Sequence, residues 1–487
     1  MALTILASDS LRMSTGTNVI QVETSTTGVY KFRFYLSVTY FTESESTTKT
    51  ITFTQPKNST GKAIFNMSEI YKNIVTPMIR PCLLEDAKST TTPSKITSIH
   101  NIPQSSSGKD RIYSQPFLKN TEGYGAFQGN CNKAVLRFYE MYSTTSDGVP
   151  IVHAGTEETV NQYIFYGRGE RKQMPQAQFS EYDLQNYTKK WLTNNYKLDS
   201  SIGSYVGYIG RTQYMTMAFM NGHIANANSD TYEVAFAFYN SAGIQLGSNL
   251  LCENNADTGG KYGGPTGATN TGRSAILFIG AGLQNLDKLN TTQAGYTGDT
   301  PSDVESSTGD TIAYYEMWMR QATAAQNSKK YRFYVTTPCD RYEETRLAYM
   351  NRFGVWEYIN LNKEKNNTYN VKRDSINKPL FASETPDAQD VDALQNVYAE
   401  EVANQGVMVT NVQVEEQMTL YTQNLDDSEL DRINDLILSP QIHLLDKEDA
   451  IALICTTNKI NTKVKGKSRL YSYQLKFKFA DPKFRTL

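Results

Sequence analysis

Two segments of this chain alternate apolar and polar side chains with a period of two residues. Residues 29–41 read VYKFRFYLSVTYF, and an aromatic or aliphatic side chain occupies every second position from Tyr30 to Tyr40. Residues 470–480, LYSYQLKFKFA, repeat the alternation from Tyr471 to Phe479. Successive side chains of a strand project to opposite faces of a sheet, so both segments are predicted to be half-buried antiparallel strands.

Six further segments have the composition of strands, because they are short and rich in aromatic and β-branched residues. They are AVLRFYEMY (134–142), QYIFYG (162–167), QYMTMAFM (213–220), TYEVAFAFY (231–239), AILFIG (275–280) and KKYRFYV (329–335). Strands in succession, without alternating helices, favour antiparallel sandwiches or barrels over βαβ units. We therefore predict a mainly β fold, with several β-sandwich or barrel-like domains and a few single packed helices.

Three segments carry helix signals. In residues 66–77, Asn66 is placed to cap a helix and Glu69 to complete a capping box before Pro77. Residues 180–191 align apolar side chains at helical spacing, and residues 426–440 begin with Asp426 as a cap and end at a proline. Each segment is predicted to be a single helix packed against a sheet.

A chain of 487 residues exceeds one ordinary hydrophobic core and suggests roughly three domains. Residues 86–110, 253–273 and 290–310 lack periodicity and are rich in small polar residues and glycine, so they are predicted to be long loops. Residues 383–404 form an acidic stretch. The expected organisation is an N-terminal β domain (1–80), a large central β region with long loops (81–382), an acidic linker (383–404) and a C-terminal α+β domain (405–487).

The net charge of the chain indicates which kinds of partner it can bind. The formal net charge of -2 gives no strong field toward nucleic acid or an anionic membrane, so the expected partners are proteins. Basic residues gather at 459–485, where the polar face of a strand explains them better than contact with DNA.

No segment approaches the ~18 apolar residues of a membrane-spanning helix, and no secretion signal is evident at the start. The five cysteines form no CxxC pair and are expected to be buried, reduced thiols.

Motifs for catalysis and cofactor binding are missing from the sequence. The four histidines are far apart, and neither HExxH nor Gly-x-Ser-x-Gly occurs. A strand followed by Gly280-x-Gly282 resembles a dinucleotide fingerprint, but Asn285 stands where the third small residue is required. Several pairs of acidic residues could be proposed for glycoside hydrolysis, and nothing in their spacing selects one. We expect no enzymatic activity, no cofactor and no metal.

The most distinctive segment spans residues 330–361. After a strand it contains a cysteine, an Arg-Leu strand, Met-Asn, Arg-Phe-Gly and an aromatic pair, carried by Cys339, Arg346, Asn351, Gly354, Trp356 and Tyr358. This segment resembles one in virion proteins of tailed bacteriophages, among them phages of Bacteroidetes (including crAss-like phages) and marine phages. In those proteins it usually has Leu-Asn and Gly-Gly, where this chain has Met350-Asn351 and Gly354-Val355.

Other segments resemble the same family in the same order along nearly the whole chain. They are FNMSEIYKNIV (65–75), WLTN (191–194), FIGAGLQNL (278–286), ELDRINDLILSPQIHLL (429–445) and KSRLYSYQLKFKFA (467–480). Each is weak by itself, and the shared order carries the resemblance.

The resemblance implies a non-enzymatic tail, hub or baseplate component, or one of the tail–head region, that forms a homo-oligomer and docks other virion proteins of the tail, portal or neck. Such a protein would assemble in the host cytoplasm and reside in the virion. A capsid-surface or fibre protein is one alternative, and an extracellular carbohydrate-binding or glycosidase module is another.

Overall fold

Strands dominate the described part of the chain, which confirms the mainly β fold. The computed structural model describes residues 3–6, 11–15, 18–41, 48–75, 113–114, 131–168, 181–182, 188–193, 196–220, 232–253, 276–287, 296–321, 326–337, 344–377, 407–422, 425, 427–446, 449–457 and 472–480. Its sheets gather around three hydrophobic cores, one N-terminal, one central and one C-terminal.

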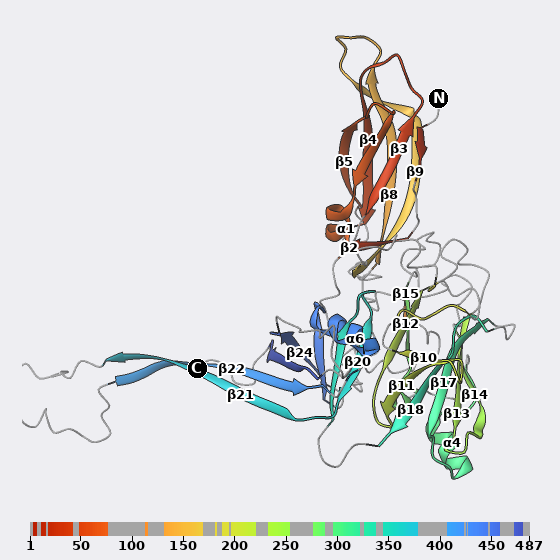
Figure 1. Cartoon of the computed structure of the whole chain (residues 1–487), viewed down its shortest axis with the longest axis vertical. Helices are drawn as coiled ribbons and strands as arrows, with labels where there is room; N and C mark the ends of the chain where they lie inside the picture. The colour runs from red at the N-terminus through yellow and green to blue at the C-terminus, as the bar shows by residue number, and fades with distance from the viewer. Residues whose placement is uncertain are drawn as a thin grey trace, which may run out of the picture.

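Two sheets enclose the N-terminal core and form the elongated unit at the top of Figure 1. One sheet runs in the order β2 (Leu11–Thr15), β9 (Ile151–Arg168), β8 (Cys131–Ser143), β4 (Tyr30–Phe41) and β5 (Thr48–Pro56). The other runs β1 (Leu3–Ile5), β3 (Val19–Thr24) and β6 (Lys62–Asn66), followed by α1 (Ser68–Ile74). In β4 the alternating side chains Phe34, Leu36 and Val38 are all fully buried, as the period of two predicts.

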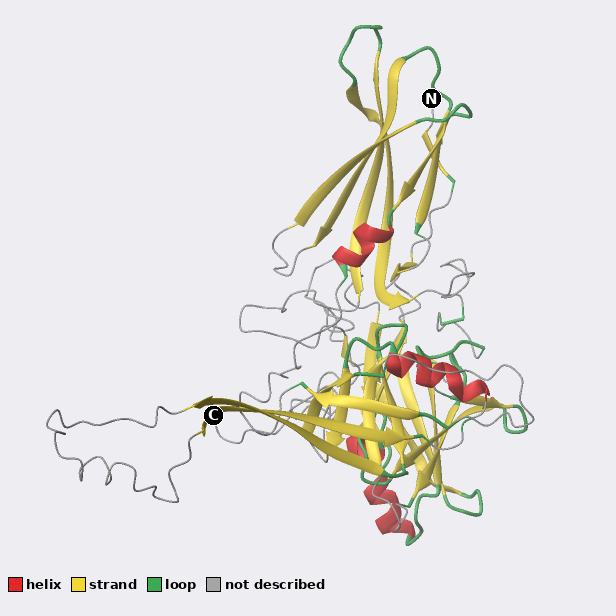
Figure 2. Ribbon diagram, turned by 60° about the vertical axis from the view of Figure 1, so that its left-hand side comes forward, coloured by secondary structure: helices red, strands yellow, loops and turns green. Residues whose placement is uncertain are grey.

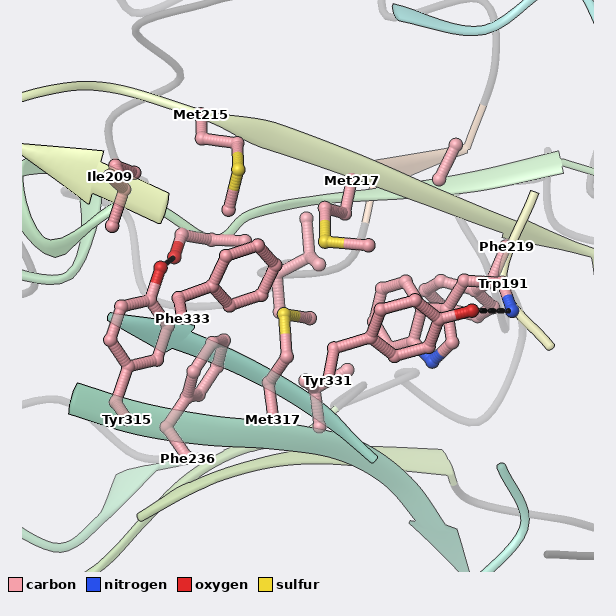
Figure 3. Packing of buried hydrophobic residues seen from close by; sticks show 14 of the residues in the cluster. Trp191, Ile209, Met215, Met217, Phe219, Phe236, Tyr315, Met317, Tyr331 and Phe333 are labelled. Atoms are coloured by element: carbon pink, nitrogen blue, oxygen red, sulfur yellow. Dashed lines mark hydrogen bonds between the residues drawn. The ribbon is translucent and has the colours of Figure 1, made fainter. Parts of the chain in front are cut away.

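The central core lies against a seven-stranded sheet. That sheet runs β10 (Lys197–Asp199), β11 (Ser204–Gly210), β18 (Tyr331–Thr336), β17 (Tyr314–Gln321), β13 (Tyr232–Tyr239), β14 (Gln245–Glu253) and β16 (Tyr296–Thr297). A smaller sheet of β12 (Thr216–Met220), β15 (Ile276–Gly280) and β7 (Tyr113–Ser114) contributes Met217 and Phe219 to the same core. Figure 3 shows Trp191 beside Tyr331, whose hydroxyl accepts a hydrogen bond from the Trp191 backbone N–H (3.1 Å).

A second seven-stranded sheet holds the C-terminal core. It runs β20 (Trp356–Leu361), β19 (Thr345–Met350), β23 (Ile442–Asp446), β24 (Asp449–Cys455), β25 (Gln474–Phe479), β22 (Val407–Tyr421) and β21 (Lys365–Asn377). The helix α6 (Asp427–Ile437) supplies Ile433 and Leu436 to this core. Strands β21 and β22 continue beyond the body of the molecule, as Figures 1 and 2 show.

The sheets do not follow the expected domain boundaries. The N-terminal five-stranded sheet unites strands before residue 80 with strands in 131–168, and the C-terminal sheet unites residues 345–377 with residues 407–479. Neither the boundary at 80 nor the stretch 383–404 therefore separates one sheet from the next. Strand partners are selected by complementary buried faces and not by proximity in the sequence, so composition alone misplaced these limits.

Two of the expected helices are present, with a different start for the first. The residue preceding α1 is Met67, and it makes no side-chain capping bond. Asn66 instead accepts a hydrogen bond from the Ser68 backbone N–H (3.1 Å). The helix expected at 426–440 is α6. The middle of the helix expected at 180–191 lies outside the described residues, and Trp191 is buried in non-helical backbone.

The segment 290–310, expected to be a loop, contains a helix. This is α4 (Pro301–Thr308), which starts with a reciprocal capping box between Thr300 and Asp303 and ends at Gly309 in the left-handed region (φ 74°). The many serines and threonines of this segment are typical of a loop, although a threonine followed by proline is a recognised signal for the start of a helix. A shorter helix, α3 (Leu283–Asp287), precedes it and follows β15. The predicted loop at 86–110 lies outside the described residues, and so does the loop at 253–273 except for Glu253, which ends β14.

Two cysteine side chains fall within the described part. Cys252 is buried and Cys455 is half-buried, and within the described residues neither belongs to a disulfide. Burial raises the pKa of the Cys455 thiol. The side chains of the remaining three cysteines lie outside the described residues.

Candidate functional site: a doubly buried hairpin and an exposed arm

The segment that carries the family resemblance folds into the hairpin β19–β20, which is buried on both faces. Its strands pair from Thr345 opposite Leu361 to Met350 opposite Trp356. One face adds Ala348 and Met350 to the central core, and the other adds Leu347, Tyr349 and Ile359 to the C-terminal core. Because both faces of β19 are buried, its sequence does not alternate with a period of two, and Leu347 to Met350 are all apolar. The hairpin therefore joins two cores.

Arg346 is the polar side chain that fixes the hairpin to the central part of the chain. Its Nη1 donates to Gln213 Oε1 (2.6 Å) and Asn360 Oδ1 (2.7 Å), and its Nη2 donates to the Tyr214 carbonyl (2.9 Å). The guanidinium also lies over the Tyr358 ring, 5.0 Å from its centroid. Burial lowers the pKa of Arg346. The planar group thus bridges β19, β20 and the segment that leads into β12.

Asn351 and Gly354 shape the turn between the two strands. The Asn351 side-chain oxygen accepts hydrogen bonds from the backbone N–H groups of Phe353 (2.9 Å) and Val355 (3.2 Å). Its amide nitrogen donates to the Leu192 carbonyl (3.1 Å). Gly354 has φ 75°, a conformation that side-chain-bearing residues rarely adopt. The turn therefore needs a short amide and a glycine at these two positions.

Glu357 is a buried carboxylate at the centre of the hairpin that the sequence reasoning did not identify. Its Oε1 accepts hydrogen bonds from Asn351 Nδ2 (2.7 Å) and Thr193 Oγ1 (2.9 Å), and its Oε2 accepts one from the Tyr349 hydroxyl (2.9 Å). Burial raises the pKa of Tyr349 well above its ordinary value, which keeps the phenol protonated and donating. No recognised local motif marks this glutamate, since Tyr349 and Asn351 lie in the same hairpin but Thr193 comes from a distant part of the chain.

The aromatic pair completes the contact with the central core. Trp356 stacks on His443 of β23, the strand on the other side of β19, with ring centroids 4.7 Å apart. The Tyr358 oxygen accepts a hydrogen bond from the Thr216 backbone N–H (3.1 Å), and burial raises the pKa of Tyr358 to about 12. Burial also lowers the pKa of His443 to about 4, so this imidazole is neutral at pH 7.

The hairpin thus gathers Arg346, Asn351, Gly354, Trp356 and Tyr358, whereas Cys339 lies outside the described residues. Its polar atoms bond to one another and to residues 192–193 and 213–216 of the central part, an arrangement suited to holding two sheets in a fixed relation. Within the described part of the chain, no group of three or more potential metal ligands converges. In the same part, no helix has the length and apolar character needed to span a membrane.

A row of four tyrosines crosses the outer face of the central seven-stranded sheet. Tyr208, Tyr334, Tyr314 and Tyr239 are direct neighbours on four adjacent strands. Their ring centroids are 5.9, 5.5 and 4.8 Å apart in that order. The outermost, Tyr208, is 67% exposed. Because the rings pack against one another, most of their faces are already covered and mainly the Tyr208 end is accessible.

The most exposed secondary structure is the distal part of the β21–β22 ribbon, residues 369–377 and 407–416, here called the arm. Every residue of β21 is exposed, and so are residues 407–410 of β22. Further along β22, Met418 and Leu420 enter the C-terminal core. The arm is therefore a continuation of a buried sheet into solvent, visible at the left of Figure 1.

The two faces of the arm differ in character. Tyr369 and Val371 lie directly opposite Glu416 and Val414, and directly paired residues share a face. The period of two places this face on the same side as Met418, which is buried in the C-terminal core. The opposite face is mostly polar, with Asn370, Lys372, Asp374, Asn411, Gln413 and Glu415, and at the far end of the ribbon it also carries Ile376 and Met408. A face that is buried in the core at Met418 therefore extends beyond the body, and it carries Tyr369 and several valines together with Arg373 and Glu416.

Comparisons with known proteins do not assign the chain to a family. No protein family description matches it, and no curated protein matches it. Solved structures with partial likeness include the calcium binding domain CBD12 of CALX1.1 (7% identity, TM-score 0.17, covering 66% of this chain and 79% of that one). A marsupial T cell receptor (9%, 0.15, covering 87% and 97%) and squid arrestin (8%, 0.15, covering 69% and 94%) are similar to the same low degree. TM-scores this low establish no common fold.

Proposed function

We propose that this protein is a non-enzymatic structural subunit of a tailed phage virion, in the tail, hub or tail–head region, which oligomerises and docks other virion proteins. The observation that carries the proposal is the arm, which extends an apolar sheet face into solvent. The ordered resemblance of segments along nearly the whole chain supports the phage assignment. Assembly in the host cytoplasm and residence in the virion follow from the same proposal.

An exposed two-stranded ribbon is unfavourable in free energy unless another surface covers it. An isolated two-stranded ribbon is at best marginally stable in water, because it buries little apolar surface on either face. On the face that carries Tyr369, this arm in addition exposes Val371, Val407 and Val409. A sheet face of this kind is typical of a surface that another protein covers. The doubly buried hairpin, by contrast, makes the body that carries the arm rigid.

Mass spectrometry of purified phage particles tests the proposal. The protein is expected in the particles at a fixed copy number relative to the other structural proteins. A deletion variant replaces residues 371–414 by a two-residue turn between the paired residues Asn370 and Glu415. This variant is expected to fold but to be absent from particles. The matched control is Ile151→Ser, which changes an exposed apolar residue far from the arm. Absence of the wild-type protein from particles would overturn the proposal.

The position within the virion separates the proposal from a capsid-surface or fibre role. Tagged copies located on particles by electron microscopy are expected at the tail or neck. Labels spread over the capsid, or confined to fibres, would replace the proposed position by one of these alternatives.

A carbohydrate-binding module is a second candidate, favoured by the tyrosine row on the central sheet. Exposed aromatic rings next to charged groups are a common sugar-binding surface, and Arg332 lies over the Tyr314 ring here (4.5 Å to the centroid). A glycan array tests this candidate, with Tyr208→Ala as the variant that removes the accessible ring. Specific binding that this substitution abolishes would favour the carbohydrate-binding function.

A further inference from the structure

We propose that the outer edge of β21 pairs with β21 of a second copy of this chain, antiparallel and around a twofold axis at Val371. This inference rests on the proposed function, since it names the contact through which the structural subunit would oligomerise. It would join two seven-stranded sheets into one continuous sheet.

The outer edge of β21 is open in the described structure. This strand is the last of its sheet and pairs with β22 alone. An edge strand presents backbone N–H and C=O groups that a further strand can pair with, and natural edges are usually short or interrupted. This one is 13 residues long. The bulge in the ribbon, between Asp374 and Ser375, places its extra residue, Thr410, in β22. The outer edge of β21 is therefore uninterrupted.

A second copy is the occupant that this edge fits, because its side chains are complementary to themselves. When Lys365 of one copy faces Asn377 of the other, all 13 residues pair and Val371 faces itself. Arg373 then lies opposite Tyr369, a favourable cation–aromatic pair, and Asp374 lies opposite Thr368. No two like charges are directly opposed.

The neighbouring symmetric registers on one side are disfavoured. Centring the axis at Lys372 would place two lysines opposite each other, and centring it at Arg373 would oppose two arginines. Directly opposed like charges destabilise a strand pair. A centre at Asn370 avoids this repulsion but leaves the last residues of the strand, Ile376 and Asn377, unpaired. Charge and overlap together therefore select Val371.

The pairing also brings apolar side chains of the two arms together on one face of the joined sheet. A twofold axis perpendicular to the sheet keeps each face on its own side, so the exposed Tyr369 and Val371 of both copies would meet. Val414 lies beside Val371 within each copy. The joined sheet would thus carry these side chains, with Arg373 of each copy, in one strip across its centre.

Disulfide formation between variants that each carry one added cysteine in β21 tests the register. Residues directly opposed across antiparallel strands have Cα atoms about 4.5–5.5 Å apart, within the range that a disulfide spans. Val371→Cys is therefore expected to form a covalent dimer under mild oxidation. The matched controls Asn370→Cys and Lys372→Cys should not, because each would face a different residue. A dimer that forms faster with either control than with Val371→Cys would overturn the proposed register.

Light scattering of the full-length wild-type chain tests the pairing itself. The mass is expected to be twice that of Val371→Lys, which places two lysines against each other, while the isosteric Val371→Thr keeps the dimer. Equal masses for the wild type and Val371→Lys, whether monomeric or oligomeric, would overturn the inference. If the protein is nevertheless present in phage particles, the proposed function stands and only this contact fails.

Discussion

At the scale of single residues, buried polar groups determine how the β19–β20 hairpin sits between two cores. Arg346 and Glu357 direct their hydrogen bonds at groups from distant strands and loops. Burying such groups is costly unless their partners are in place, so they disfavour alternative packings of the two sheets. Apolar contacts alone would tolerate more than one arrangement.

Replacing Trp356 tests the apolar side of this contact. Trp356 is 6% exposed and stacks on His443, so Trp356→Ala is expected to lower the free energy of unfolding by about 3–5 kcal/mol. Trp356→Phe retains a ring and should cost less. Denaturant unfolding followed by circular dichroism measures both effects, and an unchanged midpoint for the alanine variant would show that Trp356 does not stabilise the fold.

His443 gives the stability of the protein a dependence on pH. Its pKa is about 4 in the folded protein and 6.5 for an ordinary histidine, so the unfolded chain binds the proton more tightly. Its contribution to stability is complete above pH 6.5 and is lost as the pH falls toward 4. Between about pH 7 and about pH 4.5 the loss amounts to about 2–3 kcal/mol.

The substitution His443→Gln removes this group and isolates its effect. The variant should lose less stability than the wild type over the same interval when both are unfolded by denaturant at the two pH values. Identical losses for the two proteins would mean that His443 is not the group responsible.

At the scale of elements, the turn of the hairpin depends on the backbone of Gly354. Its φ of 75° is strained for any residue with a Cβ atom, so Gly354→Ala is expected to destabilise the protein by about 1–2 kcal/mol. Gly155→Ala in β9 is the matched control, because an added Cβ there meets nothing within 4 Å. Thermal melts should separate the two variants, and equal shifts would contradict the argument from backbone strain.

At the scale of the whole molecule, the hairpin couples the central and C-terminal cores, whereas the N-terminal core is largely separate. Weakening the hairpin by Arg346→Ala should therefore reduce the hydrogen-exchange protection of both β12 and β23. The strands β4 and β8 should retain theirs, because they enclose the N-terminal core. Loss of protection confined to the C-terminal sheet would show that the two cores unfold independently.

The sequence by itself determined the strands that are buried on one face, such as β4 and β25, and the amphipathic helix α6. Their periodicity is a local property, because one buried face leaves a regular mark on every second or every third to fourth residue. It also identified one motif that contains Arg346, Asn351, Gly354, Trp356 and Tyr358. It did not show that this motif joins the central and C-terminal cores.

Only the tertiary structure decided which strands pair across long intervals, as β4 does with β8, and which carboxylate the hairpin buries. It alone also revealed the arm, whose strands were not predicted. The reason is physical: pairing and burial depend on groups that are distant in the chain, so no short stretch of sequence records them.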